Sequence, residues 1–145
     1  MNQSADLSAD HPYILVVDDE EMIVEEMVEA LNLEGYRCVG VTDAVAALGQ
    51  LNQGCNISCV ITDLKMPGVT GAALIAKAAK SLLKLPVFIV ISGHVDPDEL
   101  QEEYAGVEEH IAAVFRKPLD IWELISFLKD SDNPALVELT SQAEL

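Results

Sequence analysis

The chain has 145 residues, half of them hydrophobic, and its 25 acidic against 8 basic residues give a net charge of −17. This length and hydrophobicity predict one folded domain rather than a disordered chain. The acidic balance excludes a broad basic surface for nucleic acids or acidic membranes, and no apolar run reaches the ~20 residues of a membrane span. We therefore expect a cytoplasmic protein that binds neither nucleic acid nor membranes. Its expected partners are proteins whose contact surfaces are basic.

Residues 1–11 are polar and lack periodicity, which predicts a mobile N-terminal leader before a domain that covers 12–129. From residue 13 onward, short apolar runs alternate with stretches of helical periodicity. We expect strands at 13–17, 37–41, 57–62, 86–91 and 111–115. We expect helices at 20–34, from a cap at Thr42 or Asp43 to 51, from Thr70 or Gly71 to 83, and at 119–129.

Two stretches of the second half are harder to assign. Residues 95–110 are rich in acidic side chains and offer a helix start at Asp96-Pro97 with few apolar residues behind it. Between them, the predicted helix at 119–129 is strongly apolar, and we place Trp122 on its apolar face. The tail at 130–145 is either a short amphipathic helix or a linker.

Alternating strands and helices predict an α/β fold with a doubly wound parallel sheet and helices on both faces. Buried parallel strands are apolar throughout, as these runs are, and their carboxyl ends meet at one edge of the sheet. The three cysteines lack the spacing of a zinc site, so we expect reduced and mostly buried thiols.

Four of these apolar runs lead into side chains that can bind ions or take part in a reaction. The first leads into Asp18 and Asp19, the third into Asp63, the fourth into Ser92 and the fifth into Arg116 and Lys117. We expect three carboxylates, a hydroxyl and an ammonium to converge at one edge of the sheet. Such a set suits a divalent cation and a phosphoryl group.

The carboxylates are candidate ligands for Mg²⁺, with Mn²⁺ as an alternative ion. Magnesium prefers oxygen ligands, so Asp19 and Asp63 would bind it directly and Asp18 either directly or through water. An isolated Asp pair usually caps the helix that follows it, and that alternative stays open for Asp18 and Asp19. The third carboxylate at a second strand end favours the metal.

Asp63 is the candidate nucleophile, because carboxylates form aspartyl phosphates. Lys117 would contact a phosphoryl oxygen as a point charge, and Ser92 would donate its hydroxyl to another. The bond between Lys117 and Pro118 has the option of a cis conformation. Taken alone, Lys117 would more often be a surface lysine and Ser92 a turn residue.

These segments, VVDDE, TDLKMPG, ISG and RKP in chain order, resemble the receiver domain of two-component response regulators. The resemblance covers about residues 12–129 and implies the flavodoxin-like strand order 2-1-3-4-5. It implies that Asp63 is the phosphoacceptor, that Asp18 and Asp19 are the acidic Mg²⁺ pair, and that the backbone carbonyl of Lys65 is a further metal ligand. It gives Ser92 and Lys117 the roles of the switch hydroxyl and the family's lysine.

The resemblance further implies a phosphohistidine donor, either a sensor histidine kinase or a histidine phosphotransfer protein, and a downstream protein of unknown identity. Homodimerisation stays open. We expect no catalysis on an external substrate, only self-phosphorylation and autodephosphorylation at Asp63. A phosphohydrolase would carry a second acid where Lys65 stands. The main alternative is an interaction module with this fold that no longer uses phosphate.

The chain departs from the family pattern three residues before Lys117. Receivers usually carry Tyr or Phe there, and this chain has Val114. Phe115 is adjacent, but strand alternation sends it to the opposite face. We therefore hypothesise that output does not depend on an inward swing of an aromatic side chain.

Overall fold

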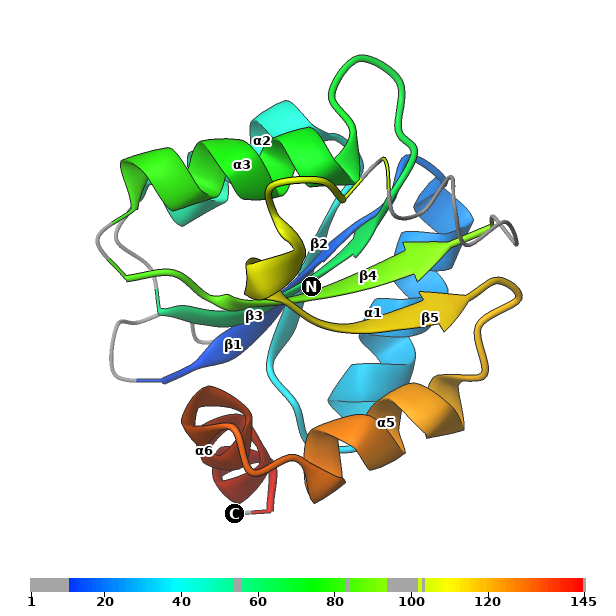
Figure 1. The fold of residues 1–145 in the computed structure, drawn as a ribbon. Coiled ribbons are helices and arrows are strands. Elements are labelled where there is room, and N and C mark those ends of the chain that lie inside the picture. Colours follow the sequence, from blue (N-terminus) through cyan, green and yellow to red (C-terminus); the bar gives the residue numbers. More distant parts are fainter. Residues whose placement is uncertain (1–10, 54–55, 83, 94–101, 103, 145) are drawn as a thin grey trace.

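The protein is described by a computed structural model that covers residues 11–53, 56–82, 84–93, 102 and 104–144. Five parallel strands form one sheet in the order β2-β1-β3-β4-β5, as Figure 1 shows. This order confirms the predicted fold class. The strands are β1 (Tyr13–Val17), β2 (Cys38–Val41), β3 (Ile57–Asp63), β4 (Val87–Ser92) and β5 (Ile111–Arg116).

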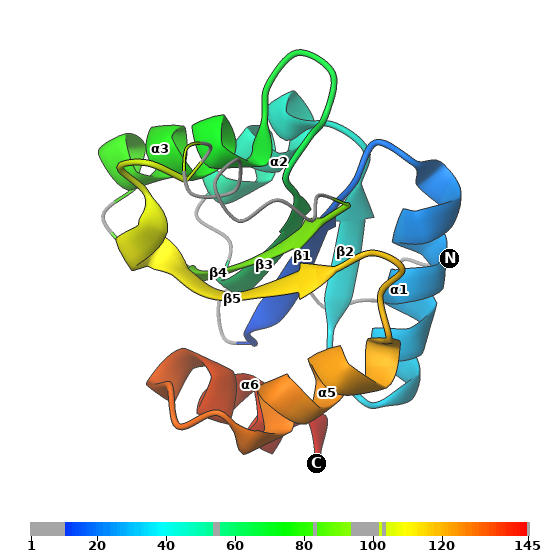
Figure 2. The same cartoon turned by 45° about the vertical axis from the view of Figure 1, so that its right-hand side comes forward.

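Helices cover both faces of the sheet (Figures 1 and 2). Helices α2 and α3 lie on one face, and α1, α5 and α6 lie on the other. The predicted helix start at Asp96-Pro97 lies outside the described residues. The helices are α1 (Glu21–Leu33), α2 (Ala44–Leu51), α3 (Gly71–Ser81), α5 (Ile121–Asp130) and α6 (Pro134–Ala143), with a 3₁₀ turn at Glu108–His110.

Side-chain caps fix the starts of four of the described helices, and in α5 the cap is Asp120, which accepts the backbone N–H of Trp122 at 2.9 Å. Asp43, rather than Thr42, accepts the backbone N–H of Ala46 at 2.7 Å, and Thr70 accepts an N–H at the start of α3 at 3.1 Å. Asn133 does the same for α6 at 2.9 Å. Each bond satisfies a donor that the helix itself leaves without a partner, so these polar residues mark the boundaries of the apolar segments.

The hydrophobic core has two layers, one on each face of the sheet. Alternate residues of β1 divide between them: Leu15 and Val17 pack toward α2 and α3, while Ile14 and Val16 pack toward α1, α5 and α6. A central strand buried on both faces must be apolar at every position, which explains the continuous run in the sequence. Cys38 and Cys59 are buried free thiols of the second layer, in agreement with the prediction for these two.

The structure corrects the predicted face of α5. Trp122 is 62% exposed, whereas Leu124, Ile125 and Leu128 are the buried residues of this helix. The helix buries the face that packs on the sheet. Trp122, in the first turn, lies beside that face and not on it. Helix formation starts at Ile121, two residues later than expected.

The C-terminal tail is a helix that belongs to the core. Leu136 and Leu139 of α6 are buried against the layer formed with α1 and α5. The hydroxyls of Tyr36 and Thr140 lie 2.9 Å apart in a hydrogen bond, and Thr140 donates to the carbonyl of Leu128 at 3.2 Å. Figure 1 shows α6 beside α5, away from the tips of the strand arrows.

No helix in the described part of the chain is long and apolar enough to cross a bilayer.

Candidate functional site

The carboxyl ends of four strands place the candidate residues at one edge of the sheet. Asp18 follows β1 directly, Asp63 and Ser92 are the last residues of β3 and β4, and Lys117 follows β5. Parallel pairing aligns these ends, with Asp63 opposite Ile91 and Ser92 opposite Arg116 in the strand register. The strand arrows in Figure 2 point to this common edge. The fold therefore brings the site residues together because the strands are parallel.

Three carboxylates form a compact cluster there. Ligand oxygens of Asp18, Asp19 and Asp63 all lie within 4.8 Å of one another. Asp18 and Asp63 are buried and Asp19 is exposed, so the cluster opens to solvent on one side. Asp18 also accepts the backbone N–H of Glu20 at 2.9 Å, but the N-cap of α1 is Glu20 itself, and its side chain makes no capping hydrogen bond. Asp18 therefore holds the turn that leads into the helix, and its role as a metal ligand stays a prediction.

Lys117 reaches into this cluster from the end of β5. Its ammonium donates to Oδ2 of Asp63 at 2.9 Å and lies 3.5 Å from Oδ2 of Asp18. The Lys117–Pro118 peptide bond is cis, the conformation that the sequence left available. Lys117 thus places one positive charge beside the two buried carboxylates of the site.

Burial and charge act in opposite directions on these groups. Removal from water raises the pKa of Asp18, although the Glu20 N–H and the Lys117 ammonium oppose the shift. Burial lowers the pKa of Lys117, but the hydrogen bond and the charge of Asp63, together with Asp18, outweigh it and the pKa is raised. Lys117 is therefore protonated at neutral pH, and the buried Asp18 carboxylate carries an electrostatic cost that a cation would relieve.

Backbone hydrogen bonds hold the surrounding loops. The N–H of Leu64 donates to the carbonyl of Ile91 at 3.0 Å, and the N–H of Lys117 donates to the carbonyl of Ser92 at 2.9 Å. The side chain of Ser92 is almost fully buried beside them. The ends of β3, β4 and β5 are thereby joined beyond the regular sheet, so the positions of Asp63, Ser92 and Lys117 are coupled.

Two residues that position Asp63 were not singled out from the sequence. The hydroxyl of buried Thr62 donates to the carbonyl of Asp63 at 2.9 Å. Gly71 packs so closely against the same carbonyl that a Cβ at this position would collide with it. The sequence showed Gly71 only as a helix start, because a contact across eight residues leaves no periodic signal.

The residues present suit a hard divalent cation. Carboxylate oxygens are ligands that Mg²⁺ prefers, and the solvent-open side leaves room for the waters that this ion usually keeps. Lys65 lies two residues beyond Asp63 with an exposed side chain, and its backbone carbonyl as a ligand stays a prediction. His94, which follows Ser92 and Gly93, lies outside the described residues.

The family model of the response regulator receiver domain matches residues 14–129. The chain belongs to the response regulator receiver family. The match includes all four strand ends of the site and stops just before the end of α5.

Relatives with established names support the assignment. The two-component response regulator PprB of Pseudomonas aeruginosa is 29% identical over 93% of this chain and 49% of its own length. The transcriptional regulatory protein BasR of Escherichia coli is 31% identical over 77% of this chain and 48% of its own length. This receiver chain thus spans about half the length of these curated relatives.

Solved structures show the same fold. A response regulator receiver protein from Pseudomonas putida matches with a TM-score of 0.74 and 28% identity, over 83% of this chain and 98% of its own. The receiver domain of an HD domain-containing protein from Pseudomonas fluorescens matches with a TM-score of 0.71 and 25% identity, over 92% of this chain and 98% of its own.

The departure at Val114 is visible in the structure of this receiver. Val114 is 44% exposed and pairs in register with Val90, whose side chain belongs to the core layer under α2 and α3. Phe115 points to the opposite layer, where its ring meets that of Phe127 edge to face at 5.9 Å between centroids. The strand alternation expected from the sequence is therefore observed, and Phe115 is held by an aromatic partner.

Proposed function

We propose that this receiver takes a phosphoryl group from a phosphohistidine onto Asp63 and transmits the signal by protein–protein contact. The observation that carries the proposal is the position of Asp63, buried at a strand end with Lys117 at 2.9 Å and two further carboxylates within 4.8 Å. An oxygen of Asp63 attacks phosphorus as the bond from phosphorus to the histidine nitrogen breaks and the imidazole leaves. Hydrolysis of the aspartyl phosphate by water later restores the carboxylate and releases inorganic phosphate.

Each group of the site has a role in this reaction. Asp18, Asp19, Asp63 and the carbonyl of Lys65 would hold Mg²⁺, which neutralises charge on the phosphoryl oxygens when bound. Lys117, protonated and already directed at Asp63, moves its hydrogen bond to a phosphoryl oxygen. Ser92 donates its hydroxyl to another oxygen. Because the transition state needs positioning and charge neutralisation rather than proton transfer, these side chains suffice without an added general base.

The donor in this proposal is a sensor histidine kinase or a histidine phosphotransfer protein, since two-component response regulators are among the relatives. The reaction is stoichiometric self-modification and not turnover of an external substrate. The test uses phosphoramidate and Mg²⁺ with the full chain, followed by intact mass measurement. A single phosphoryl adduct is expected for the wild type and none for Asp63→Asn.

A second candidate function is a receiver-fold module that signals without phosphate. The observation that favours it is Val114, because the usual aromatic reporter is missing from the strand next to the site. Failure of the wild-type chain to gain an adduct from phosphoramidate, and from any histidine kinase of the source organism, would support this candidate and contradict the first.

A further inference from the structure

The segment that leads from β3 into α3 is held by internal hydrogen bonds. The hydroxyl of Thr62 donates to the carbonyl of Asp63 at 2.9 Å, and the N–H of Gly71 donates to the carbonyl of Leu64 at 2.7 Å. The carbonyls of two successive residues are thus bound to donors of the protein itself. The next carbonyl along the chain is that of Lys65, the predicted backbone ligand of the metal.

Side chains on both sides of Lys65 anchor this segment in the core. Leu64 and Met66 are buried and belong to the layer under α2 and α3, whereas the side chain of Lys65 between them is exposed. Because both neighbours are fixed by close packing, the direction of the Lys65 carbonyl depends on the peptide planes that precede it. The peptide after Asp63 is the first of these planes beyond the strand.

Thr62 occupies a position that the core would otherwise fill with an apolar side chain. Its register partners are Val17 of β1 and Val90 of β4, which both pack in the layer under α2 and α3, and Thr62 itself is fully buried. A buried hydroxyl is unfavourable unless it is hydrogen-bonded, and this one donates to the Asp63 carbonyl. Packing alone would accept valine here, so the hydrogen bond is what distinguishes the threonine.

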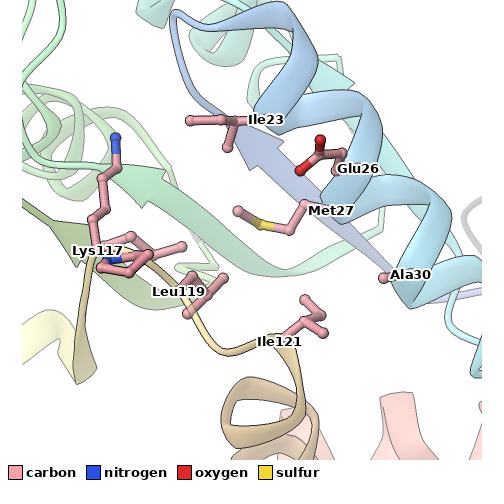
Figure 3. A pocket seen from close by; sticks show the side chains of 9 residues that line it. Ile23, Glu26, Met27, Ala30, Lys117, Leu119 and Ile121 are labelled. Atoms are coloured by element: carbon pink, nitrogen blue, oxygen red, sulfur yellow. The ribbon is translucent and has the colours of Figure 1, made fainter.

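The strand ends are packed less closely on the opposite face of the sheet. A pocket of about 370 Å³ lies there, between α1 and the segment that leads from β5 into α5 (Figure 3). Ile91, the register partner of Asp63, and Lys117 both line it. On the α3 side, by contrast, a Cβ at Gly71 would collide with the Asp63 carbonyl. The end of β3 is therefore positioned from the α3 side, because tight packing and not an open pocket fixes a backbone position.

We infer that Thr62 is a positioning residue for the metal of the phosphoacceptor site, an inference that rests on the proposed function for the role of the ion. The Thr62 hydroxyl holds the Asp63 carbonyl, so that the Lys65 carbonyl, and not that of Asp63, becomes the backbone ligand. Without the hydroxyl, the buried Asp63 carbonyl loses this donor, and its peptide plane turns toward another partner. The Lys65 carbonyl is displaced with it, and the affinity for Mg²⁺ falls.

The test is calorimetric titration of the full, unphosphorylated chain with Mg²⁺. Thr62→Val removes the hydroxyl, keeps the shape of the side chain and should weaken Mg²⁺ binding by about fivefold or more. Thr62→Ser keeps the hydroxyl and should bind Mg²⁺ within about twofold of wild type. Urea denaturation reports the stability of each variant. If Thr62→Val does not fold, Thr62→Ala makes the same deletion without a second methyl group and takes its place.

Ser58→Ala is the matched control, because it removes a hydroxyl from a buried residue at the other end of β3. It should leave the affinity for Mg²⁺ within about twofold of wild type, whatever it does to stability. A merely structural role of Thr62 would lower the stability of the Thr62→Val chain and leave its affinity for Mg²⁺ unchanged, as in the control. That result would overturn the inference.

Carbonyl ¹³C chemical shifts locate the backbone ligand directly. A carbonyl that binds the ion should show the largest change in shift when Mg²⁺ is added, and in the wild type we expect this carbonyl to be that of Lys65. In Thr62→Val the change at Lys65 should shrink or move to Asp63. The inference is wrong if the wild type binds no Mg²⁺, if its largest change lies at Asp63 or Leu64, or if Thr62→Val shows the wild-type pattern.

Labelling by phosphoramidate separates this inference from the proposed function. Thr62→Val should need a higher concentration of Mg²⁺ than wild type for half-maximal labelling, by about the factor by which its affinity falls, whereas Ser58→Ala should need the wild-type concentration. Equal concentrations for all three chains would count against the role of Thr62. A wild type that gains no adduct contradicts the proposed function, while the affinity of Thr62→Val still decides the inference, because metal binding is measured without a phosphodonor.

Discussion

The ammonium of Lys117 lies 2.9 Å from Oδ2 of Asp63, the carboxylate that we propose to be phosphorylated. The same ammonium is 3.5 Å from Asp18, and its side chain is only 26% exposed. Before phosphorylation the lysine thus balances two buried carboxylates that repel each other. Afterwards it can balance the phosphoryl group. Bound Mg²⁺ would balance the same negative charges. We therefore expect Mg²⁺ to reduce the contribution of Lys117 both to the stability of the fold and to the charge balance of the phosphoryl group.

Lys117→Ala should lower the free energy of unfolding by about 1–3 kcal/mol in the absence of Mg²⁺, because two buried carboxylates lose their cation. Saturating Mg²⁺ should recover part of this loss by taking over the charge balance. Urea denaturation with and without Mg²⁺ measures both effects. Lys80→Ala, an exposed lysine on α3, serves as the control and should stay close to wild type.

Asp18→Asn should make the metal-free protein more stable. Burial is the main cause of the raised pKa of Asp18, so its charged form is unfavourable in the folded state. Asparagine keeps the oxygen that accepts the Glu20 N–H and removes the buried charge. A gain of about 1 kcal/mol would raise Tm by about 2–4 °C. The stabilisation of the wild type by Mg²⁺ should disappear in the variant, and a variant that still gains stability from Mg²⁺ would show that Asp18 is not a ligand.

The raised pKa of Asp18 also predicts how Mg²⁺ binding depends on pH. Protons and Mg²⁺ compete for the carboxylate, so affinity should begin to fall at a pH above that at which an ordinary Asp, with a pKa of 3.8, is protonated. In the metal-free protein, stability should change with pH in the opposite direction to Mg²⁺ affinity. Because the pKa of Asp18 is raised in the folded state, the free energy of unfolding should rise as the pH falls through that pKa. Calorimetric titration with Mg²⁺ measures the pH dependence of affinity, and thermal unfolding over the same pH range measures the pH dependence of stability. Asp18→Asn should remove this contribution to the pH dependence of stability.

The sequence predicted the parts of this receiver that follow from local patterns. Continuous apolar runs predicted the buried strands, and the residues after them, such as Asp18 and Lys117, proved to meet at one edge. Contacts between distant elements were not predictable in this way. Tyr36 and Thr140 are 104 positions apart, and nothing in the tail alone decides between a docked helix and a linker. Trp122 was misplaced because hydrophobicity does not reveal which side of a short helix faces the sheet.

We propose that α6 extends the folding unit beyond residue 129. Leu139→Ala should lower the free energy of unfolding by about 2–5 kcal/mol, because the buried side chain packs against the layer shared with α1 and α5. Val137→Ala changes a side chain of the same helix that is 45% exposed, and it should cost much less. Equal effects of the two substitutions in denaturant unfolding would mean that α6 is not docked in solution.

Phe115 should keep its conformation when the receiver is activated. Its ring is held edge to face against Phe127 on the side of the sheet away from Val114. A fluorine label on the ring reports its environment by ¹⁹F NMR, before and after addition of beryllofluoride and Mg²⁺ as a mimic of the phosphoryl group. We expect no change in the rotamer populations at 115. A clear change would restore an aromatic switch to this receiver and contradict the hypothesis drawn from Val114.

Gly71 and Gly49 should respond in opposite directions to the same substitution. A Cβ at Gly71 collides with the backbone carbonyl of Asp63, which a rigid strand end cannot move aside. Gly71→Ala should therefore destabilise the fold and slow phosphoramidate labelling, because Asp63 is displaced. Gly49 is exposed in α2 with nothing near its Cβ position, so Gly49→Ala should stabilise by about 0.5–1 kcal/mol and leave labelling unchanged. If Gly71→Ala is labelled at the wild-type rate, the close packing at the Asp63 carbonyl does not position the phosphoacceptor.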